Sequence, residues 1–181
     1  MERIAKWLDS IGVTPNQMTL TGGIFCLAGG IVMAVFGNFL WALALGLAGG
    51  FCDLLDGIIS RICNKGSAFG AFFDSVVDRY SDFFLFAGVL FHYVRTGEYI
   101  VVCLCILVIL GSVVTSYAKA RMEGFGIECK VGLLERSERL AILGVGGLFP
   151  VIMPIALLIL AVLSNITAVQ RILFGKKALL K

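Results

Sequence analysis

Charged residues are scarce in this chain of 181 residues, where Asp, Glu, Lys and Arg together make up only 15%. A soluble domain of ordinary composition carries about 25% charged residues. Hydrophobic residues make up 59%, and the mean hydropathy is +0.98. The shortage of charge therefore excludes an ordinary soluble protein and indicates an integral membrane protein.

Histidine is also nearly absent, and cysteines in CxxC pairs do not occur in the sequence. His92 is the only histidine, and none of the six cysteines belongs to a CxxC pair. No arrangement of Ser, Cys and His for nucleophilic catalysis is evident, and we expect the cysteines to be small buried hydrophobic residues. The first ten residues contain four charges, so no signal peptide is expected there.

Long apolar stretches make up most of the sequence. At ~20 residues per transmembrane helix, the chain has room for about six spans and for no separate soluble domain. We place the spans at residues 17–36, 39–61, 69–94, 98–121, 134–149 and 151–172. The predicted fold is an all-α integral membrane protein, a single membrane domain over residues 1–181 with a six-helix bundle at 17–172.

The N-terminal segment has the pattern of a helix that lies in the membrane interface. Its apolar residues share one helical face: Ile4, Trp7, Leu8 and Ile11. Charged residues occupy the other face, as in amphipathic helices that lie on a lipid surface. We predict an interfacial helix over residues 2–13, followed by Thr14, which can cap the next helix ahead of Pro15.

Basic residues are distributed unevenly between the two predicted sides of the membrane. With six spans both termini share one side, which collects every Lys and Arg except Arg79, inside a span, and Arg95, on the opposite side. Lys and Arg favour the cytoplasmic side of membrane proteins. We therefore expect a multi-pass protein of the cell membrane with both termini, including a basic tail at residues 173–181, in the cytoplasm.

Five aspartates stand out within the second and third predicted spans: Asp53, Asp56, Asp74, Asp78 and Asp82. A charge at the centre of a span costs ~2.5–3.5 kcal/mol on insertion scales. The first two are spaced i,i+3 and the other three i,i+4, so each set shares one helix face. Like charges at this spacing repel, and a divalent cation with oxygen ligands would neutralise them.

Both sets of aspartates lie near the cytoplasmic ends of their predicted spans, so we expect a carboxylate-lined pocket near that face. The first four, Asp53 to Asp78, suit a two-metal site that holds the oxygens of a phosphoryl displacement. Spacing alone leaves two alternatives open. The acids could form structural ion pairs with residues such as Arg61, or they could mark an ion or proton pathway in a cation transporter.

The segment from Asp53 to Asp78 reads DLLDGIISRICNKGSAFGAFFDSVVD and contains the pattern D-x2-D-G-x2-[AS]-R-x8-G-x3-D-x3-D. It resembles the signature of the CDP-alcohol phosphotransferase family, with Ser60 where Ala is usual. The resemblance covers most of the chain and implies a six-span bundle with an N-terminal interfacial helix. It also implies transfer of a phosphatidyl-type group from CDP-diacylglycerol or CDP-archaeol to an alcohol, with release of CMP.

The resemblance further implies a role for each motif residue. Asp53, Asp56 and Asp74 would ligate metal, as two ions of Mg²⁺ or Mn²⁺. Asp78 would ligate metal and act as the general base on the acceptor hydroxyl. The implied nucleotide-binding residues are Asp53, Asp56, Gly57, Ser60, Arg61, Ser67, Gly70 and Asp74. Glycines without side chains would let the nucleotide approach the backbone, and the arginine would contact the pyrophosphate or an aspartate.

Two further segments narrow the acceptor. DSVVDRYSD around Arg79 and SYAKARMEGFGIECKVGLLERSERL at residues 116–140 resemble the branch of the family that uses inositol phosphate. Basic residues of the second segment would bind the acceptor phosphate: Lys119, Arg121, Arg136 and Arg139. Their alternative role is to set topology and contact lipid headgroups. Glycerol 3-phosphate or another alcohol remains an alternative acceptor.

The same resemblance extends to the entry of the first span, where Asn16 and Thr19 match the family. Asn16 would either cap a helix or lie on the nucleotide side of the site. The expected partners are membrane lipid, the two substrates and a second copy in a homodimer, with no nucleic acid. No task is evident for Asp82, one turn beyond Asp78.

Overall fold

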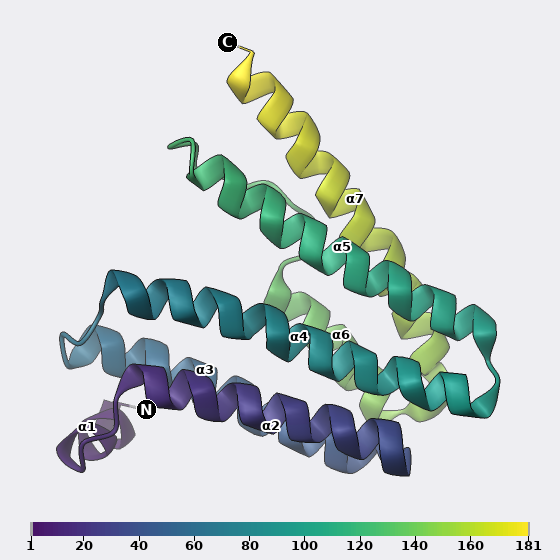
Figure 1. Ribbon diagram of the computed structural model, residues 1–181, viewed down its shortest axis with the longest axis horizontal. Coiled ribbons are helices and arrows are strands. Elements are labelled where there is room, and N and C mark those ends of the chain that lie inside the picture. Colours follow the sequence, from purple (N-terminus) through teal and green to yellow (C-terminus); the bar gives the residue numbers. More distant parts are fainter. Residues whose placement is uncertain (1, 181) are drawn as a thin grey trace. The chain divides into compact units, whose positions relative to one another are not determined.

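The computed structural model describes residues 2–180, and every regular element within this range is a helix (Figure 1). The all-α prediction is therefore confirmed for the described residues. Internal contacts divide the chain into two compact units, and the division falls between Gly88 and Val89 in the sequence. Helix α4, Ala68–Thr96, contributes to both units, and each unit is described by itself.

The first unit contains α1 (Glu2–Ser10), α2 (Pro15–Phe36), α3 (Phe39–Ile62) and the first part of α4. Local sequence explains where α2 begins: Thr14 is its N-cap, as predicted, and also forms a reciprocal capping box with Gln17. At the other end, Gly37 takes a left-handed conformation with φ 62°. The Asn38 side chain then accepts a hydrogen bond from the Trp41 amide and starts α3. This short connection makes α2 and α3 an antiparallel hairpin.

Glycine allows the helices of the first unit to approach at backbone distance. A Cβ on Gly22 of α2 would lie 2.9 Å from the carbonyl oxygen of Gly49 on α3. A Cβ on Gly30 would lie 2.3 Å from the carbonyl oxygen of Phe84 on α4. Small residues permit such close crossing in membranes, where packing rather than exclusion of water holds helices together. The glycines of α2 thus fix its separation from both neighbours.

The second unit contains the end of α4, α5 (Tyr99–Glu123), α6 (Arg136–Leu148), the short 3-10 helix η1 (Pro150–Ile152) and α7 (Met153–Leu179). Helices α5 and α7 lie side by side. Polar groups join them: Thr115 Oγ1 donates to the Ser164 carbonyl oxygen at 3.1 Å, and Asn165 Nδ2 donates to that of Leu107 at 3.0 Å.

A buried arginine fixes the loop between α5 and α6. The Arg171 guanidinium on α7 donates to the carbonyl oxygens of Val131, at 2.9 Å, and Thr115, at 2.8 Å. The Leu134 amide donates to Thr167 Oγ1 at 3.1 Å. The bonds to Val131 and Leu134 give loop backbone groups partners inside the protein, and the bond to Thr115 ties the same arginine to α5.

Four segments are long and apolar enough to cross a membrane: α2, α3, α5 and Pro150–Leu179. This confirms a multi-pass membrane protein. Helix α4 is long enough but carries five charged residues, namely Asp74, Asp78, Arg79, Asp82 and Arg95. Helix α6 has 13 residues, or ~20 Å at ~1.5 Å per residue, against a hydrocarbon core of ~30 Å. The count of six spans therefore stays a prediction.

The two ends of the chain differ in extent from their predicted boundaries. Helix α1 ends at Ser10, before the predicted limit at residue 13. It exposes Trp7, as an interfacial helix would, although its place in the interface stays a prediction. Helix α7 continues to Leu179, so most of the segment predicted as a basic tail is the last part of this helix.

We expect Gly30→Ala to destabilise the protein by about 1–3 kcal/mol, because its Cβ forces α2 away from the α4 backbone. Gly50→Ala is the matched control, since a Cβ there meets nothing within 4 Å. Thermal unfolding of both variants in detergent, followed by circular dichroism, checks this. Equal melting temperatures for the two variants would show that the α2–α4 contact is not tight.

Candidate metal and nucleotide site

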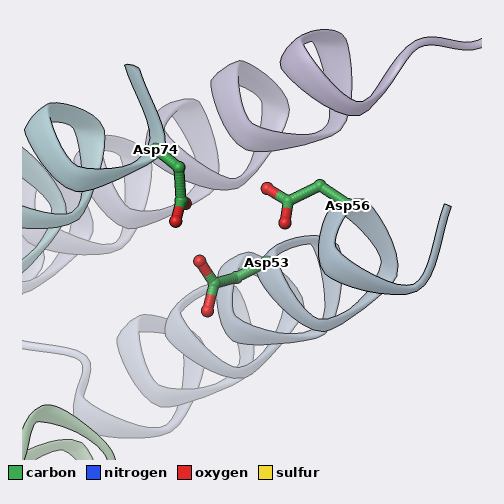
Figure 2. Close-up of side chains that lie close together, drawn as sticks. All are labelled: Asp53, Asp56 and Asp74. Atoms are coloured by element: carbon green, nitrogen blue, oxygen red, sulfur yellow. The ribbon is translucent and has the colours of Figure 1, made fainter. Parts of the chain in front are cut away.

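Three of the predicted metal ligands come together in the first unit. Asp53 and Asp56 lie one turn apart on α3, and Asp74 lies near the start of α4 (Figure 2). One oxygen from each carboxylate lies within 4.8 Å of the others. Asp56 is buried, and Asp53 and Asp74 are partly buried. The side chains point toward one another across the gap between the two helices.

The turn between α3 and α4 creates this meeting. Asn64 takes a left-handed conformation with φ 49°, and the Lys65 amide donates back to the Ser60 carbonyl oxygen at 3.1 Å. This bond has the pattern of a Schellman motif, which ends a helix and reverses the chain. Ser67 then starts α4, with its Oγ accepting a hydrogen bond from the Gly70 amide at 2.9 Å. The reversal places the first turns of α4 beside the last turns of α3.

The carboxylate group fits a divalent cation. Mg²⁺ and Ca²⁺ take oxygen ligands at about 2.0–2.6 Å, so two ligands of one ion lie up to about 5 Å apart. The 4.8 Å limit that encloses the three oxygens agrees with this spacing. Asp53, Asp56 and Asp74 are therefore the residues that would hold a divalent metal.

A residue of α2 orients the buried ligand. Thr19 Oγ1 donates to Asp56 Oδ2 at 2.5 Å, and the same hydroxyl lies 3.1 Å from the Pro15 carbonyl oxygen. Thr19 is itself 5% exposed. Hydrogen bonds to the ligands of a metal fix their orientation and often decide affinity. The start of α2 is thus part of the site, although the sequence pointed to it only through its resemblance to the family.

A cavity of about 300 Å³ lies beside the carboxylates, within the first unit. It is lined by the start of α2, the end of α3, the connecting turn and the start of α4. Five of the predicted nucleotide-binding residues line it: Asp56, Ser60, Ser67, Gly70 and Asp74. A Cβ on Gly70 would lie 3.2 Å from Asn16 Oδ1, so glycine keeps this wall open.

The other predicted nucleotide-binding residues, Asp53, Gly57 and Arg61, are not in the lining. Their role in nucleotide binding stays a prediction. A Cβ on Gly57 would meet only Arg61 Nη2, at an ordinary 3.6 Å. Conversely, the lining includes residues to which the sequence assigned no nucleotide role: Pro15, Thr19, Lys65, Gly66 and Ala71. Lys65 and Gly66 lie in the variable stretch of the motif, so only the turn geometry reveals them.

Asp78, the predicted base, lies one turn beyond Asp74 on α4. It is not part of the three-carboxylate group found among residues 2–180. Its Oδ2 lies 3.6 Å from Arg79 Nη1, which also donates to the Ser75 carbonyl oxygen at 2.8 Å. Its roles as ligand and base stay predictions. Asp82, one turn further, is 6% exposed.

The predicted acceptor-binding residues belong to the second unit. Lys119 and Arg121 lie in the last turns of α5, and Arg136 and Arg139 lie in the first turn of α6. Arg139 is 2% exposed, whereas Arg121 is exposed and lies 4.4 Å from the centroid of the Phe125 ring. Their binding of an acceptor phosphate stays a prediction.

A carboxylate cluster beside a cavity, on helices of a multi-pass membrane protein, defines a class of membrane protein with a site that fits a divalent metal. The family model described as CDP-alcohol phosphatidyltransferase matches residues 12–175. The chain therefore belongs to this family, and it is a phosphatidyl-group transferase that releases CMP. This membership decides against the cation transporter that the acidic residues left open.

Related sequences carry more specific names. The chain is 36% identical to the archaetidylinositol phosphate synthase of Pyrococcus horikoshii over 99% of this chain and 92% of the relative. It is 38% identical to the phosphatidylinositol phosphate synthase of Streptomyces avermitilis over 93% of this chain and 74% of the relative. Both relatives are thus named for products that contain inositol phosphate.

Solved structures agree with the fold. The phosphatidylinositol phosphate synthase of Mycobacterium tuberculosis with CDP-DAG bound superposes with a TM-score of 0.89 at 31% identity, covering 96% of this chain and 92% of that one. The same enzyme in complex with manganese and citrate gives a TM-score of 0.89 at 31% identity, covering 96% and 87%.

We expect Thr19→Val to weaken metal binding about tenfold, because the buried carboxylate of Asp56 loses the hydrogen bond that orients it. Thr19→Ser retains the hydroxyl and should bind metal as the wild type does. Titration of purified protein with Mn²⁺, with free ion measured by electron paramagnetic resonance, checks this. Equal affinity for the Val and Ser variants would contradict an orienting role.

Proposed function

We propose that this enzyme transfers a phosphatidyl-type group from a CDP-lipid, either CDP-diacylglycerol or CDP-archaeol, to inositol phosphate. The cavity beside Asp53, Asp56 and Asp74 carries the proposal, because it joins a metal-ligand set to a space for the nucleotide. The relatives named for inositol phosphate products support the acceptor. The neighbouring structure with CDP-DAG supports the donor.

In the proposed reaction, different residues bind the donor nucleotide and the acceptor alcohol. The donor nucleotide occupies the cavity, where Ser60 and Ser67 supply hydroxyls and Gly70 leaves room. Asp78 removes the proton from the acceptor hydroxyl, whose oxygen forms a bond to the lipid phosphorus as the bond to CMP breaks. Asp53, Asp56, Asp74 and Asp78 would hold divalent metal, as two ions of Mg²⁺ or Mn²⁺, which would neutralise charge on the phosphates. Lys119, Arg121, Arg136 and Arg139 bind the acceptor phosphate through charge-assisted hydrogen bonds.

The topology proposed with this function has six spans, an interfacial α1 and both termini in the cytoplasm. Under this topology α4 and α6 also cross the membrane. The uneven distribution of Lys and Arg supports the orientation. The carboxylate cluster then lies near the cytoplasmic face of the cell membrane, where a soluble phosphorylated alcohol can reach it. We propose a homodimer on the family resemblance.

A screen of acceptors tests the function. Purified protein is incubated with Mg²⁺ and either CDP-diacylglycerol or CDP-archaeol, and CMP release is measured with inositol phosphate, glycerol 3-phosphate, serine or no acceptor. We expect release to depend on inositol phosphate, with a product of matching mass in mass spectrometry. Release with glycerol 3-phosphate alone would transfer the assignment to that acceptor, and no release with any acceptor would refute the proposed function.

We expect Asp78→Asn to lower the rate of CMP release by about 10²–10⁴-fold, since a carboxamide cannot accept the acceptor proton. Affinity for the CDP-lipid should change far less, because Asp78 does not line the cavity. Asp82→Asn makes the same chemical change one turn further along α4 and is the control. Retained turnover in the Asp78 variant would exclude it as the base.

A further inference from the structure

Lys65 joins the cavity to α1. Its side chain lines the cavity, and its ammonium forms an ion pair with the Asp9 carboxylate of α1. The two side chains are 42% and 28% exposed, and α1 packs against α3. Lys65 therefore lies at the rim of the cavity, where a charged ligand can reach its ammonium from solvent.

Backbone geometry brings Lys65 to this rim. The left-handed residue Asn64 and the bond from the Lys65 amide to the Ser60 carbonyl oxygen fold the chain back over the end of α3. Gly66 lies close by, since a Cβ there would be 3.1 Å from Ser60 Oγ. The turn fixes the backbone of Lys65, but four flexible methylene groups separate that backbone from the ammonium. Asp9 supplies the contact that holds the ammonium in one place.

The charge of Lys65 complements what the cavity would bind. Among the described residues that line it, Lys65 is the only cation, beside the carboxylates of Asp56 and Asp74. An ammonium has three N–H donors, so it can keep its bond to Asp9 and still donate to a phosphate oxygen. The hydrogen bond from Lys65 lowers the pKa of Asp9. Asp9 is therefore ionised at neutral pH.

We propose that Lys65 binds the pyrophosphate of the donor nucleotide and that Asp9 is its positioning residue, so that α1 forms part of the CDP-lipid site. This inference rests on the proposed function, since it names a residue for the donor of that reaction. The contrasting role is structural, in which the ion pair only attaches α1 to the end of α3.

The experiment measures both the Kd for CDP, by calorimetry with Mg²⁺, and the kinetics of CMP release. We expect Lys65→Ala to weaken CDP binding about tenfold, as for a lost charge-assisted hydrogen bond. The KM for CDP-lipid should rise similarly, with kcat changed less than about twofold. Asp9→Asn should weaken CDP binding about threefold, the scale of an exposed ion pair, and Asp9→Glu should restore it.

The double variant separates positioning from structure. If Asp9 acts through Lys65, Asp9→Asn adds no further loss of CDP affinity to Lys65→Ala. Glu128→Gln is the matched control, because it removes the same charge from an exposed ion pair with Lys130 in the second unit. An unchanged Kd in Lys65→Ala, an additive loss in the double variant, or tighter CDP binding in Asp9→Asn would each overturn the inference.

The two readouts distinguish this inference from the proposed function. If the wild type releases CMP but Lys65→Ala binds CDP normally, the inference fails and the function stands. If the wild type binds CDP but releases no CMP with any acceptor, the function fails and the series of Kd values still decides the role of Lys65. A wild type that neither binds CDP nor releases CMP refutes both.

Discussion

Mutual repulsion among three carboxylates is the constraint on which the first unit depends. Asp53, Asp56 and Asp74 hold one oxygen each within 4.8 Å of the others, on helices of a membrane protein. In a medium of low dielectric constant such charges need a compensating cation. The fold brings them together nonetheless, in an arrangement that fits a divalent cation. The turn after α3 and the hydrogen bond from Thr19 to Asp56 both serve this arrangement.

Close packing at glycine sets the distances between the helices of this arrangement. Helix α2 touches the α3 backbone at Gly22 and Gly49 and the α4 backbone at Gly30 and Phe84. Because α2 has a glycine at each of these crossings, its start can lie against the end of α3 and the start of α4. Asn16 and Thr19 thereby become walls of the cavity rather than residues of a remote helix end. The cavity is formed by three helices and the turn between α3 and α4, whereas the three carboxylates come from two helices.

Helix positions were predictable because their signals are local. The capping box at Thr14 and the short connection at Gly37 and Asn38 identify the ends of α2 and the start of α3. Where local signals conflict, prediction is weaker. Helix α4 combines the length of a span with several charges, and helix α6 begins with charged residues and spans only 13 residues. Membership of these two helices in the membrane depends on what covers their polar groups, which is a tertiary property.

The sequence by itself determined the chemistry of the site. Spacings of three and four residues place carboxylates on one face of a helix regardless of the tertiary structure. The acidic residues and the family motif can therefore be recognised from the sequence alone. Only the tertiary structure decided which residues share the cavity. Thr19 is hydrogen-bonded to Asp56, which lies 37 positions away in the sequence. Lys65, in the turn between α3 and α4, forms an ion pair with Asp9 of α1. Such contacts depend on distances between helices, set by glycine crossings and a left-handed turn, and no periodicity along the chain encodes them.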